Sequence, residues 1–175
     1  TGGTGNDDDV LLGDHGEVRA DDGTAQAWQI VTSSPDDGDI DALTGGPGDD
    51  VILGGSGGSD VAGVGGDVID GDAGDDVIAG DHAFVERDGN ARVTRIAVVS
   101  FGPFYFFLTD GGDDLIDQNG HAGADVILAG YGDDRVFGGF GNDTDILFGD
   151  HGEAVRVNGA MALAGVTSTH RSVGR

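Results

Sequence analysis

The sequence predicts an all-β protein built as a stack of short repeated turns. Two nine-residue copies, Gly45–Leu53 and Gly71–Ala79, follow the pattern G-G-x-G-x-D-x-U-x, where U is a large apolar residue and one Asp replaces Gly in the second copy. Each x-U-x tail is a three-residue strand whose middle side chain points inward, because strand side chains alternate between faces. One such unit has no core of its own, so we expect it to be stable only when copies stack.

Composition makes this chain dependent on counter-ions. Its 175 residues include 36 Gly and 33 acidic residues against only 8 basic ones, all of them Arg, for a formal charge of −25. Charge repulsion and glycine entropy both oppose compaction. On the order of eight bound Ca²⁺ ions would neutralise most of the excess. The same excess argues against nucleic acid or an anionic membrane as a partner.

Several other features of the sequence bear on its compartment. The absence of Cys excludes disulfides and thiolate metal sites, and fits a secreted protein stabilised by Ca²⁺. No apolar run is long enough to span a bilayer, so we expect no membrane insertion. The chain begins within a repeat at Thr1 and shows no signal peptide, so we expect a processed product or a piece of a longer polypeptide.

A longer repeat of about 68 residues encloses the short one. The tripeptide Gly-Asp-His begins at Gly13, Gly80 and Gly149, and each copy is followed by alternating residues around a turn dipeptide typical of a β-hairpin. We therefore expect hairpins that project from the stacked turns, with arginines concentrated in or near them and acid in the turns. The predicted segments are a partial repeat tract at 1–16, a hairpin at 17–34, a tract at 35–82, a hairpin at 83–100, an aromatic connector at 101–109, a tract at 110–151, and a hairpin with tail at 152–175.

The aspartates of the repeat are the candidate metal ligands. Their fixed spacing beside an inward apolar position favours Ca²⁺ ligation over solvated Asp-Gly turns. Two longer copies, Gly2–Leu12 and Gly138–Phe148, share an irregularity that we interpret as a bulge. The shortened middle of the second tract leaves the roles of Asp60 and Asp67 open. By register the motif aspartates are Asp7, Asp50, Asp76, Asp114, Asp125, Asp134 and Asp143.

These motifs resemble the calcium-binding nonapeptides of the RTX (repeats-in-toxin) family over residues 1–15, 45–82 and 111–151. The resemblance implies a right-handed parallel β-roll, or β-helix solenoid, with Ca²⁺ between successive turns. It also implies type I secretion and folding coupled to extracellular Ca²⁺. Motif aspartates would share each ion with backbone carbonyls, here those of residues such as Gly46, Gly48, Gly130 and Gly132.

Other conspicuous residues have competing interpretations. His15, His82 and His151 are predicted to be structural rather than catalytic or metal-binding, and Trp28 is expected to pack onto the roll rather than bind sugar. The aromatic stretch is either a local core or an interface with a subunit or ligand. It comprises Phe101, Phe104, Tyr105, Phe106 and Phe107.

Three functions remain open from the sequence, and none is enzymatic, because acids repeated on every turn fit ion sites better than one catalytic pair. The first is a secreted calcium-binding structural protein that self-associates through open roll ends into a filament, layer or matrix. The second is a spacer segment of a large adhesin or surface protein. The third is a carbohydrate-binding accessory module. We expect an extracellular location, free or at a cell surface.

Overall fold

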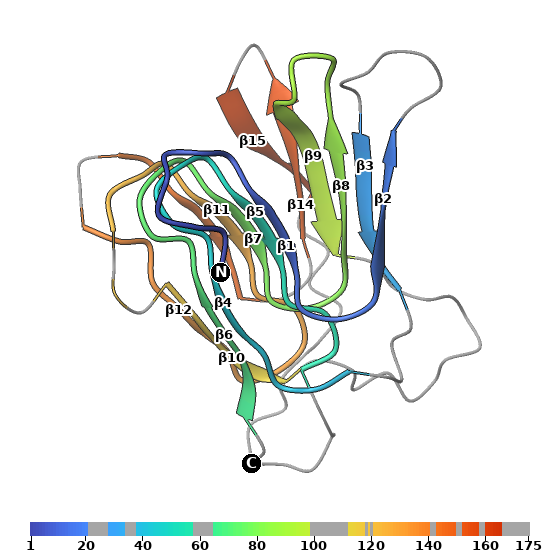
Figure 1. Cartoon of the computed structure of the whole chain (residues 1–175), viewed down its shortest axis with the longest axis vertical. Coiled ribbons are helices and arrows are strands. Elements are labelled where there is room, and N and C mark those ends of the chain that lie inside the picture. Colours follow the sequence, from blue (N-terminus) through green and yellow to red (C-terminus); the bar gives the residue numbers. More distant parts are fainter. Residues whose placement is uncertain are drawn as a thin grey trace.

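The fold was analysed in a computed structural model, which describes residues 1–20, 28–33, 38–57, 65–98, 112–117, 119, 121–140, 143–149, 152–157 and 160–165. Every regular element in these ranges is a β-strand, which confirms the predicted all-β class. No helix that could cross a membrane occurs among these residues. The strands form three sheets (Figure 1).

The first parallel sheet contains the apolar tails of the nonapeptides. Its register is regular, since Val51 pairs with Val77 and Val77 pairs with Val126. In spatial order its strands are β1 (Val10–Leu12), β5 (Val51–Leu53), β7 (Val77–Ala79), β11 (Val126–Leu128) and β13 (Ile146–Phe148).

The second parallel sheet faces the first. From β4 to β7, and again from β10 to β13, the chain alternates between the two sheets, so each strand of one is followed by a strand of the other. Parallel strands require such crossovers, and here the glycine-rich turns supply them. The strands are β4 (Ala42–Thr44), β6 (Gly65–Asp70), β10 (Asp113–Ile116) and β12 (Arg135–Val136).

A narrow apolar core lies between the two parallel sheets. Ile52, Ile78 and Ile127 are the middle residues of their strands and are fully or almost fully buried. They pack in one cluster with Ile69 and Ile116 of the second sheet. The inward position expected of the U residue is therefore confirmed.

Antiparallel strand pairs follow β1, β7 and β13, and these pairs join one another. Ile30 pairs with Val85 between the first two hairpins, and Ile96 pairs with Ala154 between the last two. The result is one six-stranded antiparallel sheet. In chain order its strands are β2 (Gly16–Ala20), β3 (Trp28–Thr32), β8 (Ala83–Arg87), β9 (Val93–Val98), β14 (Glu153–Val157) and β15 (Ala160–Gly165).

The prediction that hairpins project from the turns is wrong. The antiparallel sheet covers the outer face of the first parallel sheet (Figure 1), and their apolar side chains form one buried cluster. In this cluster Leu53 and Leu128 from the parallel sheet pack with Ile30 and Ile96 from the hairpins. Both faces of the first parallel sheet are therefore buried, and stacking is assisted by a third layer.

The hairpins leave the stack at regular intervals. They follow β1, β7 and β13, which are the first, third and fifth strands of the first parallel sheet. Each hairpin adds two strands to the antiparallel sheet for every two strands of the parallel sheet beneath it.

Candidate metal centre

A column of aspartates lies immediately before the strands of the first parallel sheet; we call it the first ladder. The backbone N–H of Asp50 donates to the carboxylate of Asp76 at 2.9 Å, and that of Asp76 donates to Asp125 at 2.9 Å. The column extends to Asp9, whose N–H donates to Asp50 at 2.8 Å, and to Asp145, which accepts from Asp125 at 3.2 Å. Each carboxylate thus fastens its own turn to the preceding one.

A second ladder runs along the second parallel sheet, where each aspartate directly precedes one of the paired residues Ala42, Val68, Leu115 and Arg135. The N–H of Asp41 donates to Asp67 at 2.8 Å, that of Asp67 to Asp114 at 2.7 Å, and that of Asp114 to Asp134 at 2.9 Å. Only one oxygen of each carboxylate accepts these ladder hydrogen bonds.

The ladders place negative charge in a dry environment. Burial raises the pKa of Asp67 and Asp76 to about 7 and that of Asp114 to about 8. Neighbouring aspartates add to the shift. The Oδ2 atoms of Asp50, Asp67 and Asp114 are buried and accept no hydrogen bond from any residue in the described ranges. Such atoms are costly unless a proton or a cation compensates them.

Glycines bring a second oxygen beside each carboxylate. A Cβ on Gly45 would lie 2.1 Å from Oδ2 of Asp50 and 2.7 Å from the carbonyl oxygen of Gly71 in the next turn. A Cβ on Gly54 would likewise lie 2.4 Å from Oδ2 of Asp67 and 2.0 Å from the carbonyl oxygen of Gly80. Only glycine fits at these points. The converging carboxylate and carbonyl oxygens are the hard ligands that Ca²⁺ prefers.

Most predicted ligands occupy this framework, although their binding of Ca²⁺ stays a prediction. The four candidate carbonyl donors adopt positive φ angles, 108° at Gly46, 147° at Gly48, 113° at Gly130 and 135° at Gly132. These angles favour glycine and make the sharp turns between sheets. The predicted aspartates that lie in the two ladders are Asp50, Asp76, Asp114, Asp125 and Asp134.

Asp7 and Asp143 do not occupy ladder positions. In the two longer repeat copies the extra residues precede the ladder, so Asp9 and Asp145 take those places instead. Asp143 accepts the N–H of Gly123 at 2.9 Å through Oδ2. Counting forward from the glycines misassigns these copies. Counting back from the three paired residues that end each copy identifies the aspartate directly before them, which also finds Asp41 and Asp67.

In the two copies of the Gly-Asp-His motif that the structure describes, the aspartate contacts a neighbouring turn. Asp14 accepts the N–H of Ser56 at 2.7 Å, and the buried Asp81 accepts the N–H of Tyr131. Each thereby anchors the start of a hairpin to a neighbouring turn. Nε2 of His82 lies 2.8 Å from the Ser56 hydroxyl, and burial lowers the pKa of this ring. Those contacts fit the structural role predicted for His82.

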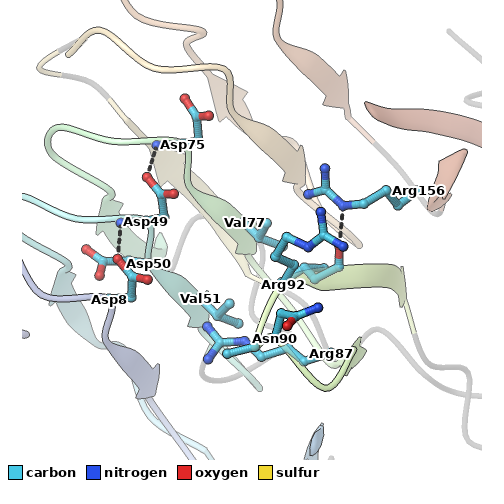
Figure 2. Close-up of a pocket in the computed structure, with 12 residues that line it drawn as sticks. Asp8, Asp49, Asp50, Val51, Asp75, Val77, Arg87, Asn90, Arg92 and Arg156 are labelled. Atoms are coloured by element: carbon cyan, nitrogen blue, oxygen red, sulfur yellow. Dashed lines mark hydrogen bonds between the residues drawn. The ribbon is translucent and has the colours of Figure 1, made fainter. Parts of the chain in front are cut away.

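A cavity of about 290 Å³ separates the acidic turns from the hairpin ends. Figure 2 shows the aspartates on one side and the arginines on the other. The aspartates continue the stacking, since the N–H of Asp49 donates to Asp8 at 3.1 Å and that of Asp75 to Asp49 at 3.0 Å. The acidic turns and the arginines of the hairpins, which are separated along the sequence, thus face each other across this cavity. The arginines that line it are Arg87, Arg92 and Arg156.

The predicted aromatic interface cannot be placed against this site. Phe101, Phe104, Tyr105, Phe106 and Phe107 lie outside the described residues, as does the side chain of Trp28.

Comparison with known proteins agrees with the repeat geometry. The family model for the RTX calcium-binding nonapeptide repeat (four copies) matches residues 36–59, 61–81 and 119–145. These segments contain most of both ladders. No curated protein and no solved structure matches the chain significantly.

Proposed function

Because this chain belongs to the RTX family of calcium-binding repeat proteins, we propose that it is a secreted structural protein whose two parallel sheets form one right-handed β-roll on binding Ca²⁺. The observation that carries this proposal is the pair of buried carboxylate ladders. Their oxygens repel one another without a cation, and the chain has a formal charge of −25. Weak extracellular sites in the millimolar range would keep the chain unfolded inside a cell and fold it outside.

Each ion would be held between two successive turns. The donors would be Oδ2 of a ladder aspartate and the carbonyl oxygen of the glycine that opens the next turn, as at Asp50 with Gly71 and Asp67 with Gly80. Ca²⁺ there would neutralise the carboxylate and tie two turns together. The ion would therefore link successive turns, as the ladder hydrogen bonds do.

End-to-end assembly is the second part of the proposal. Leu147 is the middle residue of β13, the position that points inward in the other strands, yet it is 45% exposed. Phe137 and the strongly exposed Phe140 lie in the same final turns. A further turn stacked on β13 would cover Leu147 and supply partners for the outer edge of β13. A second copy of the chain can provide that turn, and repeated contacts of this kind give a filament or layer.

The same exposed edge favours a second candidate, a spacer segment of a larger surface protein. There the covering turn would come from the same polypeptide rather than from another copy. The hairpin sheet suits such an array because it continues with the same period as the roll beneath it.

Two measurements test the proposal. Far-UV circular dichroism of the full chain should show β-structure in about 5 mM Ca²⁺, a concentration above the dissociation constants of weak extracellular calcium sites. The β-structure should be lost in EGTA. Retained structure in excess chelator would contradict coupled folding. Light scattering in the same buffers should show growth to large particles in Ca²⁺ that reverses in EGTA.

A matched pair of variants identifies the contact. Leu147→Glu should abolish particle growth while leaving Ca²⁺-dependent folding intact. Val68→Glu adds the same charge at a residue of similar exposure on β6 and should leave growth unchanged. A wild-type monomer that folds in Ca²⁺ would exclude the filament and leave the spacer candidate.

A further inference from the structure

In one part of the roll, a turn position that is glycine in other copies is occupied by side chains that can bind metal ions. The second residue of the turn is Gly46 in one copy and Gly139 in another, both with positive φ. In two stacked turns between them this place is taken by Asp72, which has φ of 71°, and by His121. The imidazole Nε2 of His121 lies 3.2 Å from Oδ1 of Asp72.

Two strand ends bring further carboxylates to His121. Asp70 ends β6, and Asp117 directly follows β10 with φ of 54°. Asp70, Asp117 and His121 each offer a ligand atom, and these three atoms lie within 4.8 Å of one another. Nδ1 of His121 is 3.5 Å from Oδ1 of Asp70. Two ligands of one tetrahedral ion with bonds of about 2.0–2.2 Å stand about 3.3–3.6 Å apart, so the separation of Nδ1 of His121 from Oδ1 of Asp70 suits a shared metal.

The cluster contains two buried atoms that make no hydrogen bond within the described part of the chain. Oδ2 of Asp117 and Nδ1 of His121 are inaccessible and make no hydrogen bond there. Asp117 itself is only 2% exposed. A carboxylate oxygen and an imidazole nitrogen, both carrying lone pairs in one small space, are the arrangement that a cation would complete.

The surrounding polar groups orient the ligands. If Nε2 of His121 carries the proton, it donates to Asp72, which leaves the lone pair on Nδ1 facing Asp70. The amide of Asn119 donates to the other oxygen of Asp70. Histidine ligands in metal sites commonly donate their second nitrogen to a carboxylate in this way.

We propose that Asp70, Asp117 and His121 bind one divalent transition-metal ion of the zinc type. The site adjoins the first ladder, because Asp117 lies close enough to Asp125 to interact with its charge. Imidazole nitrogen favours zinc over Ca²⁺, which takes oxygen ligands. Three protein ligands would leave one coordination position for water. Asp72 is a positioning residue that fixes the tautomer of His121.

The test uses the full chain in about 5 mM Ca²⁺, so that the weaker oxygen sites are filled. Isothermal titration with Zn²⁺ should show one site per chain, and Co²⁺ should give the visible absorption of a tetrahedral complex. Both His121→Ala and Asp117→Asn should weaken Zn²⁺ binding by at least about tenfold. His15→Ala removes an exposed histidine elsewhere and should leave Zn²⁺ binding unchanged.

Folding of each variant is followed by circular dichroism in the same samples. Asp117→Asn preserves the shape of the side chain, and asparagine tolerates the positive φ, so this variant should fold even if His121→Ala does not. The proposal is overturned if the wild type binds no Zn²⁺ above Ca²⁺, or if folded Asp117→Asn binds it as tightly as the wild type. Either result would leave His121 as a partner in an ion pair with Asp70 and Asp72.

Discussion

Replacing Asp114 by Asn should change stability in opposite directions with and without calcium. Burial raises the pKa of Asp114 from 3.8 to about 8, with the neighbouring Asp67 as the next cause. Between those two pH values the folded calcium-free chain binds one more proton than the unfolded chain, so its stability falls as pH rises. At about 1.36 kcal/mol per pH unit, the loss by pH 7 is about 4 kcal/mol from this one residue.

Asn cannot ionise, so Asp114→Asn removes this penalty, while its amide oxygen can still accept the N–H of Asp67. In EGTA, the far-UV signal of the wild type should decline as pH rises toward 8, and the decline in the variant should occur at higher pH. In Ca²⁺ at pH 7 the variant lacks a charged ligand and should need more Ca²⁺ to fold. Asp133→Asn is the control, since it removes the same charge from an exposed residue.

The reasoning fails if Asp114→Asn changes the stability of the fold in the same direction in EGTA and in Ca²⁺. A lower pH midpoint in EGTA would mean that the charged carboxylate stabilises the apo chain. An unchanged Ca²⁺ midpoint would mean that Asp114 does not contribute to an ion site. Equal effects in Asp133→Asn would assign both shifts to net charge alone.

Two further substitutions test the packing, each by urea unfolding in Ca²⁺. Gly130→Ala should lower the free energy of unfolding by at least about 2 kcal/mol, because φ is 113° and the new Cβ would lie 2.2 Å from Oδ2 of Asp81. Gly89→Ala is the control, since a Cβ there meets nothing within 4 Å, and it should be nearly neutral. Similar losses of stability in both variants would contradict this explanation. Leu128→Ala should cost about 2–5 kcal/mol because Leu128 is buried between the first parallel sheet and the hairpins. Leu147→Ala, on the exposed end strand, should cost less than half as much, and a small effect at Leu128 would mean that the hairpins do not pack there.

The repeat units and hairpins could be predicted because their signals are local. An Asp-Gly turn and a three-residue apolar strand each follow from a few adjacent residues. The pairing of one hairpin with the next joins residues far apart in the chain, such as Ile30 with Val85 and Ile96 with Ala154, so no local pattern reports it. A signal for the covered face was nevertheless present. The outward positions of β5 are Val51 and Leu53, whereas the second parallel sheet carries Thr44 and Asp70 at such places.

The ladder residues show a second limit of pattern counting. Asp7 and Asp143 fit the motif when it is counted from its glycines, but the extra residues of those copies lie in the turn, not in the strand. Strand pairing between stacked copies determines which aspartate is aligned, and it selects Asp9 and Asp145. Repeat positions are therefore assigned correctly by counting from the paired strand residues rather than from the glycines of the turn.

Because the hairpins leave after alternate strands of the first parallel sheet, the number of turns between two hairpins is constrained. Neighbouring strands lie about 4.8 Å apart in either kind of sheet, so two roll strands span the width of one hairpin. Removing a single turn between two hairpins would bring them one strand spacing apart, where two strands cannot fit. Adding one would open a gap in the outer sheet. The outer sheet therefore stays continuous only if two turns are gained or lost together with one hairpin, so the number of hairpins fixes the length of the roll.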